Sequence, residues 1–226
     1  MNILVLGKGK TGSLVTEVAR ERGHLVRPIA SAENVDQGAL TRAALTGTDV
    51  VIDFTTPHAV LANIAACLGS STSMVIGTTG WYDKIPQVRN LLESSDTALV
   101  FGANFSVGVN LFFEVARAAS PALKLGYSGR IIERHHVHKK DKPSGTAVAI
   151  NNVLYTGSGK KLEIDSIREG DIVGDHEIVL RSESDMITLA HSASSRRGFA
   201  EGAVKAAEWI KGKKGFYDFR DIWREL

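Results

Sequence analysis

The chain has 226 residues and a mass of 24.3 kDa, and 43% of its residues are hydrophobic and 23% charged. This is the composition of a globular protein that can bury a substantial core, and it excludes a disordered or collagen-like chain. A net charge of +2 gives no whole-chain reason to bind nucleic acid or a membrane. The single cysteine, Cys67, excludes an internal disulfide framework and any metal site built from several cysteines. The apolar start at Met1 predicts no signal peptide, and no apolar run approaches the roughly 20 residues of a membrane span.

Over residues 1–105, short apolar runs alternate with helical patterns. This alternation predicts βαβ units, a parallel sheet and right-handed crossovers, which together make a Rossmann-type α/β domain. The pattern predicts strands at 2–6, 24–29, 50–54, 73–77 and 98–101, and helices at 13–22, 59–67 and 86–92.

After Asn104 the pattern changes to strands with few helices between them. It predicts a smaller α+β domain with a mixed or antiparallel sheet, in which 155–161 is a turn-rich connection. The amphipathic helix near the C-terminus needs a sheet face to cover, so we expect residues 1–106 and 197–226 to form one domain and 107–196 the other. The expected helices are 110–119 and 199–210, and the expected strands 130–134, 178–181 and 186–191.

The first motif is G-x-G-x-x-G, placed directly between the first strand and the first helix. It comprises Gly7, Lys8, Gly9, Lys10, Thr11 and Gly12. In dinucleotide-binding domains, the first glycine permits a tight turn, the second lets the backbone approach a pyrophosphate, and the third lets helix and strand pack closely. A plain glycine-rich turn is the alternative, but the position favours dinucleotide binding. The P-loop pattern does not occur.

The choice between NADH and NADPH stays open at this stage. No clean ribose-binding acid ends the second strand, and Glu33 lies somewhat late. Lys8 and Lys10 could meet an additional phosphate, which slightly favours NADPH. The alternative is that both lysines are simply solvated.

The second motif is E-R-H-H-V-H-K-K-D-K-P-S-G-T-A, from Glu133 to Ala147. A metal site is disfavoured, because adjacent histidines on a strand point to opposite faces and the lysines would repel a cation. A solvated basic loop is a second interpretation. The third is an anion-binding and proton-transfer site, in which Ser144 caps a helix whose first N–H groups bind a carboxylate beside Lys139 and a histidine.

This segment closely resembles the signature of the dihydrodipicolinate reductase family, the NAD(P)H-dependent 4-hydroxy-tetrahydrodipicolinate reductases. The resemblance extends over essentially the whole chain. Further matching blocks, in the family's order, are D-F-T-T-P at 53–57, G-T-T-G at 77–80, N-F-S-V-G-V-N at 104–110, G-D-I-V-G-D-H at 170–176 and H-S-A-S-S-R at 191–196.

The resemblance implies reduction of 4-hydroxy-tetrahydrodipicolinate to tetrahydrodipicolinate in the diaminopimelate and lysine pathway, in the cytoplasm, without a metal. It implies catalytic roles for His135 and Lys139. The cyclic dicarboxylate substrate would contact His136, Gly145 and Thr146, while Asp53 would order a strand end. Besides Gly7 to Gly12, the cofactor-binding residues would be Gly77, Thr78, Thr79, Gly102, Ala103, Asn104 and Phe105.

The resemblance also implies a homo-oligomer, usually a tetramer, with residues 107–196 as the substrate-binding and oligomerisation domain. The glycine turn is one residue shorter than the common family form, and 151–167 lacks a longer loop that contributes to subunit contacts in relatives. Two other functions remain as alternatives: another NAD(P)H-dependent imine or keto-acid reductase, and a non-enzymatic nucleotide-sensing module. The module is disfavoured because the chain shows no helix-turn-helix pattern or phosphate-reading basic patch.

Overall fold

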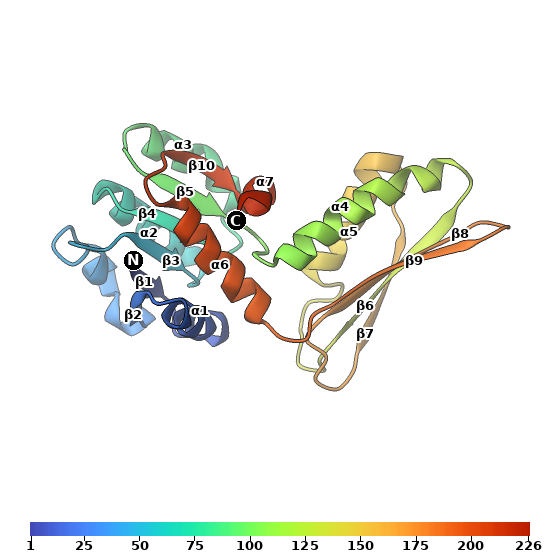
Figure 1. The fold of residues 1–226 in the computed structure, drawn as a ribbon, viewed down its shortest axis with the longest axis horizontal. Helices are drawn as coiled ribbons and strands as arrows, with labels where there is room; N and C mark the ends of the chain where they lie inside the picture. Colours follow the sequence, from blue (N-terminus) through green and yellow to red (C-terminus); the bar gives the residue numbers. More distant parts are fainter. The chain divides into compact units, whose positions relative to one another are not determined.

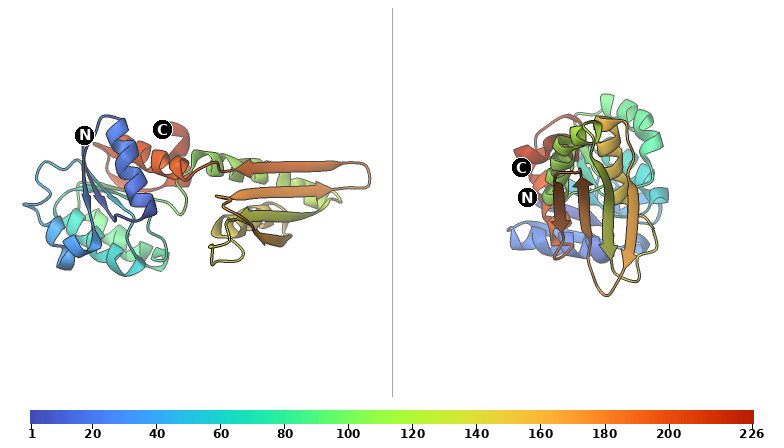
Figure 2. Two further views of the ribbon diagram at one scale, coloured as in Figure 1. Left: turned by 90° about the horizontal axis from the view of Figure 1, so that it is seen from below. Right: turned by 90° about the vertical axis from the view of Figure 1, so that its right-hand side faces the viewer.

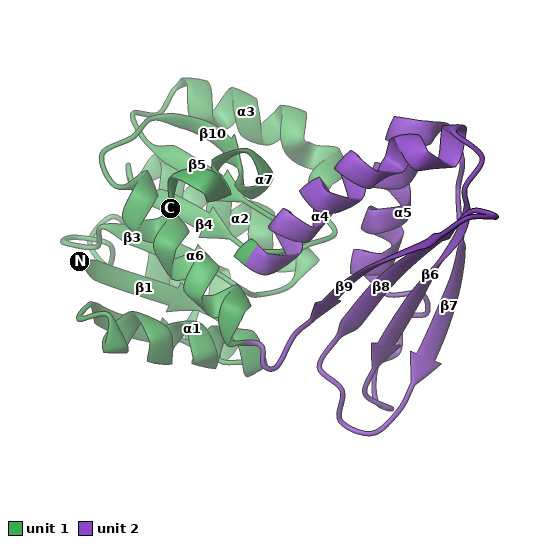
Figure 3. Cartoon of the chain, turned by 45° about the vertical axis from the view of Figure 1, so that its right-hand side comes forward, with its two compact units in different colours: residues 1–107, 197–226 green, residues 108–196 purple.

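The computed structural model describes all 226 residues and divides into two compact units (Figure 3). Unit 1 comprises Met1–Val107 and Arg197–Leu226, and unit 2 comprises Gly108–Arg196. The chain therefore leaves unit 1 after its fifth strand and returns to it for the last thirty residues. Each unit has its own sheet and its own hydrophobic core.

Unit 1 is built on a six-stranded sheet in the order β10-β5-β4-β3-β1-β2, in which every neighbouring pair is parallel (Figure 1). The central strands read as continuous apolar runs because both of their faces are covered. The strands are β1 (Asn2–Leu6), β2 (Leu25–Ile29), β3 (Val50–Asp53), β4 (Ser73–Ile76), β5 (Ala98–Phe101) and β10 (Gly215–Asp218).

Helices cover both faces of this sheet. On one face, Val5, Ile52 and Val100 pack against α1 (Lys10–Glu21) and α6 (Arg197–Ile210). On the other face, Leu4, Val51 and Leu99 pack against α2 (Pro57–Gly69) and α3 (Ile85–Glu93). A short helix, α7 (Phe219–Ile222), follows β10. The unit is thus a three-layer α/β/α fold of the Rossmann type.

Unit 2 is built on a four-stranded mixed sheet in the order β7-β6-β8-β9 (Figure 2). The β6–β7 pair is parallel and the other two pairs are antiparallel. Two helices, α4 (Val107–Ala119) and α5 (Gly145–Ser158), pack on one face around Phe112, Ile131, Ile150 and Ile178. The strands are β6 (Ser128–His135), β7 (Glu163–Arg168), β8 (Asp175–Arg181) and β9 (Met186–Ser192).

The structure differs from the sequence-based expectation in one connection, in two strands, and in the short helix α7, which had not been predicted. The expectation for 155–161 is wrong over its first half, since α5 continues through Ser158 and ends at Gly159, which has a φ of 74°. The edge strands β7 and β10 had not been predicted. β7 has no apolar run long enough to be recognised as a strand, and β10 is only four residues long. Both segments are strands because they pair with a neighbouring strand, β7 with β6 and β10 with β5.

Candidate active site

The glycine turn in unit 1 connects β1 to α1 through contacts that only glycine permits. Gly7 has a φ of +99°, and a Cβ there would lie 2.3 Å from the carbonyl oxygen of Phe54. A Cβ at Gly12 would lie 1.9 Å from the carbonyl oxygen of Gly7. A Cβ at Gly9 would meet nothing within 4 Å. The first and third glycines thus serve the packing of strand and helix, while the second leaves an open approach to the backbone at the start of α1.

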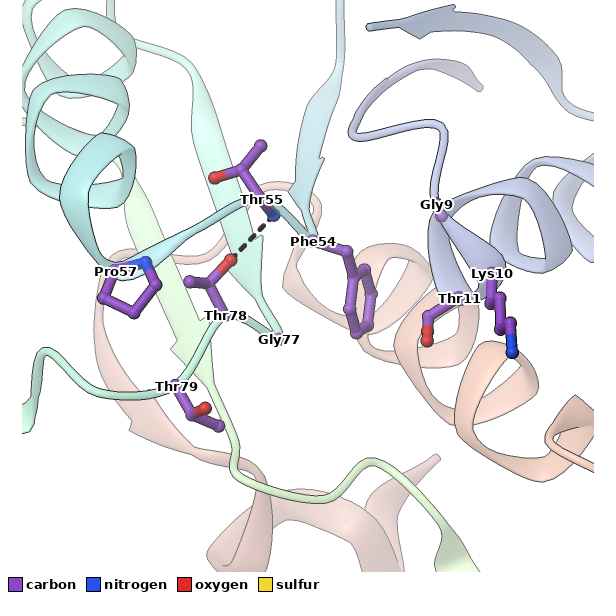
Figure 4. A pocket seen from close by; sticks show the side chains of 10 residues that line it. Gly9, Lys10, Thr11, Phe54, Thr55, Pro57, Gly77, Thr78 and Thr79 are labelled. Carbon is purple, nitrogen blue, oxygen red and sulfur yellow. Dashed lines mark hydrogen bonds between the residues drawn. The ribbon is translucent and has the colours of Figure 1, made fainter. Parts of the chain in front are cut away.

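A cavity of about 290 Å³ opens beside this turn, at the carboxyl ends of β1, β3 and β4 (Figure 4). In such sheets, ligands bind outside the carboxyl ends of the strands, and a helix N-terminus offers free N–H groups to a phosphate. Seven of the expected cofactor residues line the cavity, together with three for which the sequence predicted no contact. The seven are Gly9, Lys10, Thr11, Gly12, Gly77, Thr78 and Thr79, and the three are Phe54, Thr55 and Pro57.

Asp53 organises the far wall of this cavity. Its fully buried carboxylate accepts hydrogen bonds from the backbone N–H and the hydroxyl of Thr55, at 2.8 and 2.7 Å. It also accepts from the Thr78 hydroxyl at 2.9 Å and from the Asn63 amide at 2.8 Å. Thr78 in turn accepts from the Thr55 N–H, the bond drawn in Figure 4. One carboxylate thereby joins the ends of β3 and β4 to α2, which satisfies its buried oxygens.

Glu33 lies beside the glycine turn, although the sequence placed it late for a ribose ligand. Its carboxylate pairs with the Lys8 ammonium at 2.6 Å and accepts from the Ala30 N–H, also at 2.6 Å. Both side chains are about half exposed. The hydrogen bonds from Lys8 and from the Ala30 N–H hold the pKa of Glu33 below its usual range. A negative charge therefore stands next to Lys8.

The expected cofactor segment 102–105 does not line this cavity. The Phe105 side chain is buried in the core of unit 1, 4.6 Å from the ring of Phe219 between centroids, and meets Phe54 edge-on. Asn104 accepts from the Ser106 N–H at 2.8 Å. Gly102 is held close to Phe219, where a Cβ would lie 2.9 Å from that residue's own Cβ. Any ligand contact of Phe105 would therefore come from its backbone. The remaining member, Ala103, is exposed.

In unit 2, a row of ionisable side chains lies across one end of the sheet, on the face that the helices cover. The pairing register brings them together: Glu133 lies opposite Ser166 and His176, His135 lies opposite Arg168, and His176 lies opposite His191. His135 is buried, and its Nδ1 contacts the fully buried carboxylate of Glu133. Burial lowers the pKa of His135, and the cations of Lys139 and Arg168 act in the same direction, whereas Glu133 raises it.

His176 connects this row to the start of α5. Its Nε2 lies 3.2 Å from the hydroxyl of Ser144, and its ring centroid lies 5.2 Å from that of His135. Ser144 is the N-cap of α5 and accepts from the Ala147 N–H at 3.2 Å, as the sequence predicted. Burial and the nearby His135 and His191 lower the pKa of His176 to about 4. His176 is therefore neutral at physiological pH.

Lys139 lies in the loop between β6 and α5, with its ammonium 2.8 Å from a carboxylate oxygen of Asp141. Burial raises the pKa of Asp141, but the contacts with Lys139 and with the backbone N–H of Gly145 outweigh it and lower the pKa. A carboxylate of the chain itself thus lies between the lysine and the first N–H of α5. A lysine ammonium and the N-terminus of a helix each favour an anion.

The remaining expected substrate contacts belong to the same loop and helix. His136 is half-buried, and its Nε2 lies 3.1 Å from the Arg196 guanidinium. Thr146 is half-buried in the first turn of α5, and His138 is exposed. No group of three or more histidine, cysteine, aspartate or glutamate side chains is placed to hold a metal ion. No helix has both the length and the apolar character needed to cross a membrane.

The fold and these two sites define a class of protein. A parallel α/β unit with a glycine turn and a cavity at the carboxyl ends of its strands, joined to a second unit, is typical of pyridine-nucleotide-dependent oxidoreductases. Family models for dihydrodipicolinate reductase match both parts of the chain, the N-terminal one over residues 1–105 and the C-terminal one over 108–223. The chain therefore belongs to the dihydrodipicolinate reductase family and is an NAD(P)H-dependent oxidoreductase.

Individual relatives agree with this assignment. A 4-hydroxy-tetrahydrodipicolinate reductase of Christiangramia forsetii is 33% identical over all of this chain and 99% of its own length. One from Neisseria meningitidis is 37% identical over 86% of this chain and 77% of its own. The fold is similar to that of the dipicolinate-bound dihydrodipicolinate reductase from Paenisporosarcina sp. TG-14, with a TM-score of 0.81, 22% identity, and coverage of 98% of this chain and 99% of that one.

Proposed function

We propose that this protein reduces 4-hydroxy-tetrahydrodipicolinate to tetrahydrodipicolinate, a step of the diaminopimelate and lysine pathway, and that it does so in the cytoplasm. Its relatives bear the name of this activity. The observation that carries the proposal is the cluster of His135, Lys139 and the N-terminus of α5 in unit 2, where the Lys139 ammonium already pairs with the Asp141 carboxylate. A cyclic dicarboxylate supplies two such anions.

The proposed roles follow from this placement. The backbone N–H of Gly145, the Thr146 hydroxyl and His136 bind substrate carboxylates, and Asp141 must release Lys139 when they do. Lys139 then delivers a proton to the ring carbon next to the one that is reduced. His135 contacts the reacting ring, and the cationic Lys139 stabilises the negative charge that develops there. Asp53 does no chemistry, because all of its contacts serve the cavity wall.

The cavity beside the glycine turn would hold the central part of the reduced dinucleotide, which supplies the hydride when bound. The open approach at Gly9 and the free N–H groups of α1 suit the pyrophosphate, and Gly7 to Gly12 would hold it. Thr78, Thr79 and Gly77 line the same cavity on the side of β4. The segment from Gly102 to Phe105 would contribute backbone groups only.

Both cofactors should bind, with NADPH bound at least as well as NADH. Lys8 and Lys10 are the cations at the turn, but Glu33 neutralises part of this attraction and offers an acceptor to a ribose hydroxyl. In Glu33→Gln, Lys8 is freed and a repelling charge is lost, so we expect the affinity ratio of NADPH to NADH to rise several-fold. The ratio should shrink with added salt, because exposed pairs are screened. Titration of both cofactors at low and high salt measures it. A wild-type preference for NADH that ignores salt would identify Glu33 as the ribose ligand instead.

We also propose that the protein is a homo-oligomer, and a tetramer as in the family pattern. The compact connection formed by α5 and β7 is the feature that distinguishes this chain from that pattern. Light scattering coupled to gel filtration should give a mass of four times 24.3 kDa. A mass of one or two chains would contradict the tetramer without affecting the assigned activity.

The activity itself is tested by oxidation of NADPH with freshly generated 4-hydroxy-tetrahydrodipicolinate, compared with a panel of keto acids and other cyclic imines. Selective turnover of the first substrate supports the proposal. Faster turnover of a keto acid would favour the alternative of another imine or keto-acid reductase. Tight dinucleotide binding without turnover of any substrate would favour a nucleotide-sensing module.

A further inference from the structure

Glu133 is a buried carboxylate in the middle of the ionisable row of unit 2, and the role proposed for the site does not use it. Its side chain has no exposed surface. One carboxylate oxygen contacts Nδ1 of His135, and the other lies 2.9 Å from the Arg168 guanidinium. A buried carboxylate is costly unless cations or donors compensate it, so these contacts are what permit Glu133 to stay ionised there.

The sheet fixes this arrangement through its register. Glu133 and His135 are two residues apart on β6, so their side chains leave the same face. Arg168 lies directly opposite His135 on the parallel neighbour β7, on that face as well. Arg168 also donates to the carbonyl oxygen of Asp141 at 2.6 Å, which ties the Lys139 loop to the same cluster. The regular pairing of β6 with β7 therefore holds the Glu133 carboxylate against the His135 imidazole.

The other ring nitrogen of His135 is turned toward a position that has no side chain. A Cβ built at Gly174 would lie 3.0 Å from Nε2 of His135, so any larger residue at this position would crowd that nitrogen. When Nδ1 carries its hydrogen and donates to a carboxylate, a neutral imidazole has its lone pair on Nε2. A carboxylate that orients a histidine in this way is a known device of catalytic sites.

We propose that Glu133, anchored by Arg168, is the positioning residue of His135: it accepts the Nδ1 hydrogen and so presents Nε2 to the substrate. The proposal rests on the proposed function for the identity of that substrate. It assigns Glu133 no contact with substrate or cofactor. It predicts that the carboxylate acts through the orientation and the proton affinity of one imidazole.

The charged and titratable groups around His135 determine whether its proton affinity rises or falls when Glu133 is replaced. Glu133 on β6 favours the protonated ring, whereas Lys139 of the loop and Arg168 on β7 oppose it, and His176 on β8 packs against it. Burial of Glu133 alone would raise its pKa, but its contacts with Arg168, Ser166 and His135 lower it, so it is an anion at neutral pH. Removing this anion must therefore weaken proton binding by His135.

The direct test is nitrogen NMR of the histidine side chains, with His135 assigned by its loss in His135→Asn. In the wild-type protein, we expect a neutral His135 with hydrogen on Nδ1 and none on Nε2. In Glu133→Gln, the proton-binding constant of His135 should fall at least tenfold, since an adjacent opposite charge typically shifts a pKa by 1–3 units. Glu133→Asp keeps the charge but shortens the reach, so it should restore part of the proton affinity.

Kinetics form the second measurement. Glu133→Gln should lower kcat by about 10-fold to 100-fold and change its pH profile, while the dinucleotide Kd stays unchanged. Glu133→Asp should be intermediate. The matched control is Glu114→Gln, which removes a carboxylate paired with an arginine on the surface of α4 in the same unit. It should change neither the His135 resonance nor kcat.

The outcomes separate this inference from the proposed function. At neutral pH, hydrogen on Nε2 of wild-type His135 would overturn the positioning role even if Glu133→Gln does not fold. An unchanged proton-binding constant in a folded Glu133→Gln would do the same. If the NMR results are as expected but 4-hydroxy-tetrahydrodipicolinate is not reduced, the proposed function fails and the positioning of His135 stands.

Discussion

At the scale of single residues, the role of an ionisable side chain in this protein depends on its neighbours more than on its residue type. Lys8 of the glycine turn pairs with the carboxylate of Glu33. Lys139 of the histidine-rich segment pairs with the carboxylate of Asp141. Each pair has at least one side chain that is about half exposed, so solvent and salt weaken both contacts. In the proposed mechanism, a substrate carboxylate replaces Asp141 as the partner of Lys139.

Lys139→Ala should lower kcat by about a hundredfold or more while leaving the dinucleotide Kd unchanged. The lysine is assigned to proton delivery in unit 2 and does not line the cavity beside the glycine turn. Steady-state kinetics and a fluorescence titration with NADPH measure the two effects. The control is Lys140→Ala, which removes the adjacent exposed lysine. Weakened NADPH binding with normal turnover would show that the loop is wrongly assigned.

His176 should make unit 2 less stable in acid. Its pKa is lowered from 6.5 to about 4, mainly by burial. As the pH falls from 7 to 5, the unfolded chain takes up a proton that the folded chain cannot hold, so stability is lost over this window, by up to roughly 2 kcal/mol.

In His176→Gln, hydrogen exchange of the β6 and β8 amides, corrected for intrinsic rates, should depend less on pH than in the wild type. Replacing the exposed His58 by glutamine should leave the dependence unchanged. Equal pH dependence in wild type and His176→Gln would show that this ring is protonated in the folded state as readily as in the unfolded chain.

At the scale of elements, helices and strands could be predicted where a single apolar pattern in the local sequence indicates the type of element. The runs at β1, β3 and β5 are buried on both faces, and α6 carries its alanines and Val204 on one side. β7 could not be recognised, because its sequence E-I-D-S-I-R pairs on one edge only and is no more than half-buried. The end of α5 was missed because its last turn contains Thr156 and Gly157, which form helices weakly.

The candidate site likewise contains features that the local sequence predicts and features that it does not. The glycine turn and the Ser144 cap depend on neighbours in sequence, so spacing was sufficient to predict them. The contacts of Glu133 with Arg168 and of His135 with His176 depend on strand pairing between distant segments, which no local pattern encodes. Phe54 and Thr55 line the cavity beside the glycine turn because β1, β3 and β4 end at one edge of the sheet, which strand order alone determines.

The β1–α1 turn allows the two functions of its glycines to be separated. Gly12→Ala should destabilise unit 1 by about 1–3 kcal/mol, since its Cβ would overlap the carbonyl oxygen of Gly7. Gly9→Ala meets nothing and has a φ of −73°, so it should leave stability nearly unchanged. It should nevertheless weaken dinucleotide binding about tenfold or more, because the methyl group occupies the approach to the backbone.

Urea unfolding followed by tryptophan fluorescence measures the first effect, since Trp81, Trp209 and Trp223 all belong to unit 1. NADH and NADPH titrations measure the second, and each variant is the control for the other. If Gly9→Ala binds both cofactors normally, the turn does not hold the pyrophosphate.

At the scale of the whole molecule, the chain builds two units with separate cores. The cavity beside the glycine turn lies in unit 1, and all groups for which we propose a role in substrate chemistry lie in unit 2. The cores share no buried side chain, so each unit has its own set of stabilising contacts. A ligand that binds one unit stabilises it through mass action, by about 2.7 kcal/mol at a concentration of 100 times its Kd.

Hydrogen exchange measured by mass spectrometry should therefore locate the two ligands in different units. NADPH alone should slow exchange at the glycine turn and at 77–79 by up to about a hundredfold, since 1.36 kcal/mol corresponds to a factor of ten. It should leave the centres of β6 and β8 unchanged. Pyridine-2,6-dicarboxylate, the ligand named with the Paenisporosarcina relative, should slow exchange in 136–147 instead. Lys139→Ala should abolish the second effect and retain the first. Protection of the unit 2 sheet by NADPH alone would contradict the division, because it would require the nucleotide to stabilise a core in which none of its assigned residues lies.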